Sequence, residues 1–84
     1  MNIIWTVHAE QRLKEWMQKL NVSKKDIENI LLHPHQIVPG DLDIFVTHFK
    51  LNDGLLRIPF KYIGEDIKII TIYWTSKIDK YWKD

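Results

Sequence analysis

The amino-acid sequence predicts an α+β domain in which an N-terminal helical hairpin packs on a four-stranded antiparallel meander sheet. Apolar residues repeat at helical spacing up to Pro34 and alternate with the period of a β-strand after it. Asn52-Asp53-Gly54 lies between two alternating runs and is a strong signal for a tight hairpin. With no linker or internal repeat in 84 residues, we expect residues 1–84 to form a single domain.

The first helix is expected from Val7 to Leu20, with Thr6 as its N-cap because a threonine hydroxyl can accept a backbone N–H there. The second helix is expected to begin at Ser23, where Asp26 supplies a capping box. It is expected to end at His33-Pro34, since the residue before a proline disfavours helix. The first helix carries one apolar stripe, predicted to face the core: Ala9, Leu13, Trp16, Met17 and Leu20.

Four strands are expected after the helices, at about 36–38, 45–51, 55–63 and 67–75. The last is apolar on both faces, which indicates a central or well-covered strand. Pro59 conflicts with the third strand because proline has no backbone N–H to donate. The sequence therefore predicts either a bulge at Pro59 or a donor position that faces an unpaired side.

Composition excludes several classes of function. The chain has no Cys, which rules out a disulfide scaffold and cysteine catalysis and fits a cytoplasmic protein. No apolar run approaches the roughly 20 residues of a membrane span, so no membrane partner is expected. The net charge of +1 is lower than that of a typical duplex-DNA binder. His33, His35 and His48 have no further ligand at a recognisable spacing, and we expect neither a metal site nor a cofactor.

The C-terminal end of the chain, residues 73–83, is locally basic and aromatic. Such an end can bind single-stranded nucleic acid through phosphate contacts and base stacking. The alternative is a strand and tail whose aromatics are core and whose lysines are solvated. The residues concerned are Tyr73, Trp74, Lys77, Lys80, Tyr81, Trp82 and Lys83.

Arginine is scarce: the chain has ten Lys but only Arg12 and Arg57. His8 lies four residues before Arg12, so both side chains share one face of the first helix. Imidazole titrates near neutral pH, and guanidinium is a fixed fork for phosphate oxygens. The pair also has a structural interpretation, in which it ties helix to sheet and Arg12 bonds a carboxylate or carbonyl. Both interpretations remain open at this point.

Several short motifs now combine into a family likeness. His8-Ala9-x-x-Arg12 opens the first helix, Leu20–Ile27 resembles the usual start of a second helix, and Leu31–Pro34 resembles its end. Ile69–Tyr73 and Thr75–Lys77 resemble a final strand. In this order and spacing the chain resembles the small "HAxxR" branch of the RelE/ParE-like toxin superfamily, over nearly its whole length.

The resemblance implies a RelE-like fold and the toxin half of a bacterial type II toxin–antitoxin pair, with a cognate antitoxin as partner. Many such toxins are metal-independent endoribonucleases acting on mRNA, often on the ribosome, whereas ParE-like relatives inhibit gyrase. The alternative is a non-catalytic protein-binding module or a degenerate toxin-like domain. This chain departs from strong RelE-type toxins in being nearly neutral, with few basic residues in its strands.

Metal-independent RNA cleavage needs a base for the 2′-hydroxyl, an acid for the leaving oxygen and cationic donors for the phosphorane-like charge. His8 is the candidate base or acid, and Arg12 and Arg57 are candidates to hold the phosphate. The expected catalytic residues are His8, Arg12, Arg57 and Tyr73. The expected substrate-binding residues are Thr71, Thr75, Lys77 and Tyr81. A single site requires that the end of the last strand meet the His8 end of the helix.

Overall fold

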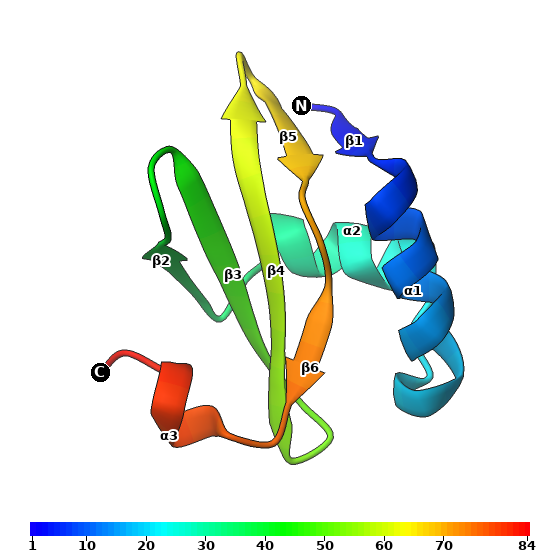
Figure 1. Ribbon diagram of the computed structural model, residues 1–84, viewed down its shortest axis with the longest axis vertical. Coiled ribbons are helices and arrows are strands. Elements are labelled where there is room, and N and C mark those ends of the chain that lie inside the picture. Colours follow the sequence, from blue (N-terminus) through cyan, green and yellow to red (C-terminus); the bar gives the residue numbers. More distant parts are fainter.

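The computed structural model describes residues 1–84 and shows an α+β fold built on a six-stranded sheet (Figure 1). The sheet order is β1-β5-β4-β3-β2, and β6 pairs with β4 beyond the end of β5. All pairings are antiparallel except β1 with β5. The elements are β1 (Ile3–Trp5), α1 (Val7–Leu20), α2 (Lys24–Leu32), β2 (Gln36–Pro39), β3 (Ile44–Leu51), β4 (Gly54–Ile63), β5 (Asp66–Ile69), β6 (Tyr73–Thr75) and α3 (Ile78–Tyr81).

The predicted α+β class is confirmed, but the four-stranded antiparallel meander is wrong in two places. A first strand, β1, precedes the helices and joins the sheet in parallel with β5. The predicted last strand divides into β5 and β6. The sheet is therefore mixed, and a short helix, α3, follows it.

Both predicted helices are confirmed. Their ends were predictable because capping by neighbouring residues fixes them. The Thr6 hydroxyl accepts the Ala9 N–H at 3.0 Å, and Asn21 leaves the first helix in the left-handed conformation, with φ of 55°. Ser23 and Asp26 form the reciprocal capping box of α2.

The tight turn between β3 and β4 is confirmed and sets the register of these two strands. Asn52 and Asp53 have φ values of 52° and 59°, as a type I′ turn requires. Leu51 then pairs with Gly54, and the register continues one-to-one to Ile44 and Lys61. No bulge interrupts it.

Pro59 explains why the last strand divides. The Ile70 N–H donates to the Pro59 carbonyl at 2.8 Å, but Pro59 has no N–H with which to return the bond. The ladder stops there, so β5 pairs with β4 from Phe60 onward and β6 pairs with β4 only up to Arg57. Strand β4 itself has no bulge, so the predicted unpaired donor position is correct; the extra residue lies in the last strand, whose register with β4 shifts by one residue between β5 and β6.

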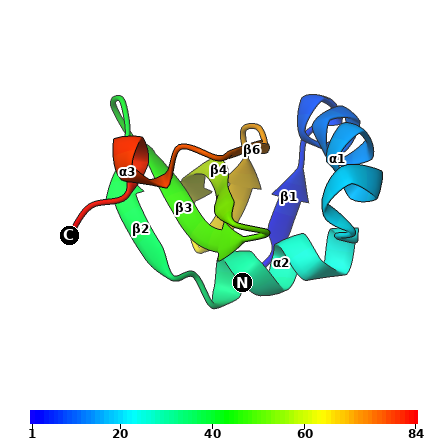
Figure 2. The same ribbon diagram turned by 90° about the horizontal axis from the view of Figure 1, so that it is seen from below.

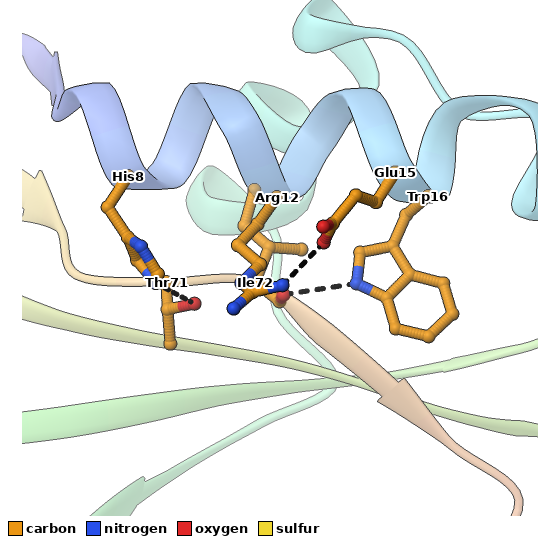
Figure 3. A network of polar contacts seen from close by, with 6 residues as sticks. All are labelled: His8, Arg12, Glu15, Trp16, Thr71 and Ile72. Atoms are coloured by element: carbon orange, nitrogen blue, oxygen red, sulfur yellow. Dashed lines mark hydrogen bonds and ion pairs between the residues drawn. The ribbon is translucent and has the colours of Figure 1, made fainter.

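Helix α1 docks against this interruption (Figure 3). The Thr6 hydroxyl donates to the Ile69 carbonyl and the Trp16 indole donates to the Ile72 carbonyl, each at 3.1 Å. Two carbonyl groups at the edges of the interruption thereby receive side-chain donors, and the helix is held in one position along the sheet.

The core lies between the helices and one face of the sheet. On β4 this face carries Leu56, Ile58 and Phe60, all buried in a single cluster with residues of α1 and α2. The opposite face carries Arg57, and the C-terminal residues with α3 lie on that side (Figure 2). No helix has both the length and the apolarity needed to cross a membrane.

Candidate functional site

Arg57 lies on the sheet face opposite the two long helices and is partly buried. Strand register places His48 of β3 on one side of it and Tyr73 of β6 on the other. The guanidinium carbon is 3.9 Å from the centre of the Tyr81 ring and 5.2 Å from that of Tyr73. Two aromatic faces therefore hold the cation in place. We call Arg57, His48, Tyr73 and Tyr81 the Arg57 cluster.

His48 is fully buried, and both of its ring nitrogens are engaged. The Arg57 Nε–H donates to His48 Nε2 at 3.1 Å, so Nε2 carries no proton. Nδ1 must then carry the proton and donate it to Gln36 Oε1 at 3.0 Å. Burial, followed by the charges of Arg57 and Lys83, lowers the pKa of His48 to about 4. The imidazole is therefore neutral at physiological pH.

Arg57 has no carboxylate partner. The two ion pairs of the protein are Arg12–Glu15 and Lys24–Glu10, both on the helical side. Burial lowers the pKa of Arg57 from its ordinary value, and the contact with Tyr81 opposes the shift. A guanidinium remains charged despite such a shift. A partly desolvated cation without a counter-ion suits an anionic ligand, and its fork matches phosphate oxygens.

The C-terminal segment (Ser76–Asp84) forms a wall of the Arg57 cluster. The Gln36 side-chain amide accepts the Lys83 N–H at 3.1 Å and donates to the Lys83 carbonyl. Trp82 stacks on His48, with ring centres 6.3 Å apart and an interplanar angle of 28°. The Lys50 ammonium lies 4.2 Å from the centre of the Trp82 ring. Together these contacts hold Tyr81 against Arg57.

The predicted pair on α1 lies in a second group of contacts (Figure 3). A hydrogen bond of 3.2 Å joins His8 Nε2 to the Thr71 hydroxyl, and Arg12 donates to Glu15 at 2.6 Å. Both partners of the ion pair are exposed, at 45% and 57% of the side-chain surface. These contacts are the ones the structural interpretation expected, namely helix tied to sheet and Arg12 on a carboxylate.

The structure divides the predicted site into two groups. Arg57, Tyr73 and Tyr81 are brought together, whereas no hydrogen bond, ion pair or ring contact links them to His8 or Arg12. Thr71 belongs with His8 at the interruption of the last strand.

Thr75 and Lys77 lie in the turn that leads to α3. The Thr75 hydroxyl accepts the Lys77 backbone N–H at 3.1 Å, and the Lys77 side chain is exposed. Thr75 pairs with Leu55, two residues from Arg57 along β4 and on the same face. The Thr75 hydroxyl thus shapes the turn, and Lys77 is free to contact a ligand.

Sequence reasoning missed His48 and Gln36 as members of the cluster. The sequence contained a signal for His48. A two-residue turn at Asn52-Asp53 pairs Leu51 with Gly54, and the residues three positions away from the turn on each strand are then His48 and Arg57. Gln36 had no local signal, because its contact depends on how β2 and the C-terminal segment meet. No group of three or more His, Cys, Asp or Glu side chains is arranged to hold a metal ion.

Comparisons with known proteins support the fold. No protein-family model matches the chain, and no curated protein matches it. Among solved structures it is similar to the crystal structure of the Brucella abortus ribonuclease toxin BrnT, with a TM-score of 0.58 and 22% sequence identity. The match covers 90% of this chain and 97% of that protein. At this level of identity the likeness shows a shared fold, and membership of the "HAxxR" branch stays a prediction.

Proposed function

We propose that the protein is the toxin of a bacterial type II toxin–antitoxin pair and a metal-independent endoribonuclease that cleaves mRNA in the cytoplasm. The observation that carries the proposal is the Arg57 cluster, in which a partly buried guanidinium lies between two tyrosines without a counter-ion. The fold shared with BrnT, which is described as a ribonuclease toxin, supports the same activity.

In the proposed reaction the 2′-hydroxyl of RNA loses its proton and attacks the adjacent phosphorus. The bond to the 5′-oxygen breaks, and that oxygen takes up a proton, leaving a cyclic phosphate and a free 5′-hydroxyl. The Arg57 Nη groups bind the non-bridging oxygens and stabilise the charge that develops there.

Proton transfer falls to groups that can touch the substrate. The Tyr73 and Tyr81 hydroxyl groups belong to the rings that flank the guanidinium, so they are our candidates for exchanging protons with the two ribose oxygens. His48 is excluded from this role, because it is fully buried and both of its nitrogens are engaged.

The remaining predicted residues receive secondary roles. We propose that Lys77 contacts the RNA backbone beside the cluster, together with Thr75 at the same turn. His8, Arg12 and Thr71 lie in the separate group on α1, and we retain them as candidates for contacting RNA away from the cleaved bond. The proposed protein partner is a cognate antitoxin that covers the Arg57 cluster.

Cleavage of a labelled single-stranded RNA by the purified protein, in the presence of EDTA, tests this proposal. We expect Arg57→Gln to lower the cleavage rate by about 1000-fold, in line with loss of a transition-state donor, at unchanged thermal stability. Arg12→Gln is the matched control: loss of a contact away from the cleaved bond should act on KM, and kcat should change by less than about 3-fold, the scale of an exposed side chain. Substrate with a 2′-deoxy sugar at the cleaved position should be inert.

A second candidate function, a non-catalytic protein-binding module such as a gyrase-directed inhibitor, is favoured by one observation. The C-terminal segment lies against the cluster, and none of the cavities of the protein is lined by Arg57. Growth inhibition that persists in Arg57→Gln, with no RNA cleavage by the wild-type protein, would select this candidate over the nuclease.

A further inference from the structure

We infer that Gln36 and His48 are positioning residues for Arg57, which fix the direction of its guanidinium and leave its Nη groups for a bound phosphate. The inference rests on the proposed function, since it concerns how the same site binds its substrate. Neither residue touches the substrate itself. Each acts through the next, in the order Gln36, His48, Arg57.

The contact between His48 and Arg57 uses one donor of five. A guanidinium can rotate about its side-chain bonds and offer any of its N–H groups, but the 3.1 Å bond to His48 Nε2 engages Nε–H. The Tyr73 and Tyr81 rings then confine the plane of the group. The two Nη groups are left for an anion, in the paired arrangement that suits two phosphate oxygens.

Gln36 determines which nitrogen of His48 can accept. An imidazole with its proton on Nε2 would place two donors face to face at Arg57, so only the tautomer with a proton on Nδ1 is compatible with the cluster. Gln36 Oε1 selects this tautomer by accepting from Nδ1 at 3.0 Å. A hydrogen-bonded side chain behind a ring nitrogen is a common way of fixing a functional histidine.

The same Gln36 amide also holds the wall of the site. Its Oε1 accepts from the Lys83 N–H as well as from His48, and its Nε2 donates to the Lys83 carbonyl. One side chain therefore aligns the imidazole behind Arg57 and the segment that places Tyr81 in front of it. This arrangement couples the orientation of the guanidinium to the seating of the C-terminal segment.

The surroundings of His48 keep it neutral, and a neutral ring is needed for Nε2 to accept from Arg57. Arg57 faces it from β4, Lys83 and Trp82 from the C-terminal segment, and Gln36 from β2. Lys50 of β3 lies beyond Trp82. None of these groups is acidic, so nothing nearby would stabilise an imidazolium, and a protonated His48 would lose its bond to Arg57.

Two substitutions of similar size test the role of His48. In His48→Gln the side-chain oxygen can accept from Arg57 Nε–H in place of Nε2, whereas His48→Leu offers no acceptor. We expect His48→Leu to lower kcat for RNA cleavage by about 100-fold with little change in KM, as misplacement of a catalytic group does. His48→Gln should stay within about 5-fold of the wild-type kcat and lose any acidic limb that His48 contributes to the pH profile.

Nitrogen-15 NMR of the wild-type protein gives a readout that does not depend on cleavage. We expect ring-nitrogen shifts of a neutral His48 protonated at Nδ1, and an Arg57 Nε–H signal protected from exchange, which His48→Leu removes and His48→Gln retains. Finding the proton on Nε2, or equal losses of kcat in the two variants, overturns the inference. If the NMR pattern is as expected but wild-type protein cleaves no RNA, the proposed function fails while the positioning of Arg57 stands.

Discussion

Arg12 and Arg57, the two arginines of the chain, occupy opposite environments. Arg12 is exposed on α1 and pairs with Glu15 one turn away on the same helix. Arg57 is partly buried in the sheet, pairs with no carboxylate, and is held by His48 and two tyrosine rings. The His8–Arg12 motif, which stands out in the sequence, therefore lies at the surface. Arg57 carries the partly desolvated charge, and strand pairing places it beside its neighbours.

The two arginines differ in burial and in pairing, and these two properties distinguish a candidate functional residue from a surface ion pair. An exposed ion pair spaced three residues apart on a helix stabilises the fold by roughly 0.3–0.5 kcal/mol, because water and salt screen the attraction between its charges. A desolvated cation without a counter-ion costs free energy in the folded state, and an anionic ligand would offset that cost. Burial without a counter-ion is the informative property of Arg57.

Replacing each arginine by lysine should give the largest difference in activity between the two positions. Arg57→Lys keeps a positive charge but loses the Nε–H that donates to His48 and the fork that binds two phosphate oxygens. We expect RNA cleavage to fall about 100-fold, the scale of a misplaced catalytic group, while Arg12→Lys cleaves like the wild type. Equal activity of the two variants would contradict the assignment of Arg57.

Gly54 ends the turn that sets the β3–β4 register and so pairs Arg57 with His48, and a substitution at Gly54 should destabilise this hairpin. A Cβ atom on Gly54 would lie 2.2 Å from the Trp74 ring and 2.6 Å from the Thr75 carbonyl oxygen, so Gly54→Ala must displace both the indole and the β6 backbone. We expect a loss of about 1–3 kcal/mol in the free energy of unfolding, the usual cost of overpacking, measured by urea denaturation. The loss should shrink in a Trp74→Leu background without vanishing, because the Thr75 carbonyl oxygen remains; an unchanged loss would show that the indole does not contribute to it.

The region around His48 should make the stability of the protein depend on pH, whereas the region around Arg12 should not. The pKa of His48 is about 4 when folded and near the ordinary 6.5 when unfolded, so the unfolded state binds more protons between these values. Stability should therefore fall as pH drops from 6.5 to 4, by up to about 1.4 kcal/mol per pH unit for this one group.

Urea denaturation at several pH values, comparing wild type with His48→Gln, measures this contribution. The difference in unfolding free energy between the two proteins should vary with pH only in that window. An Arg12→Gln variant should follow the wild-type curve, since its region contains no comparably buried group. A constant difference across pH would show that His48 titrates normally in the folded protein.

The smallest expected effect concerns the surface pair itself. Glu15→Gln removes the partner of Arg12, and we expect a change of at most about 0.5 kcal/mol in the free energy of unfolding. Adding salt to the wild-type protein should have an effect of the same size. A loss above about 1 kcal/mol would indicate that Arg12 supports the fold more than its exposure suggests.

Features fixed by neighbouring residues were predictable from the sequence. Thr6 and the Ser23–Asp26 box gave both helix starts, and Asn52-Asp53 gave the hairpin. Strand β1 was missed because its parallel partner, Ile67–Ile69, lies more than sixty residues away. Pro59 was identified as a conflict, but its effect depended on which strand faced its missing donor.

The candidate site was likewise predictable only in part. Tyr73 and Tyr81 were expected near a phosphate-binding arginine, and they do flank Arg57. His8 and Arg12 were expected there too, but α1 meets the last strand at Thr71, where the strand leaves the ladder. Only the three-dimensional course of that strand could separate the two groups.

The interruption at Pro59 also has a consequence for how the protein moves. The carbonyl groups of Ile69 and Ile72 are satisfied by Thr6 and Trp16, residues more than fifty positions earlier in the chain. When α1 lifts away, those carbonyls lose their donors and the edge of the sheet loosens with the helix. Hydrogen exchange should then show the start of α1 and residues 69–72 opening as one cooperative unit, while the β3–β4 hairpin stays closed.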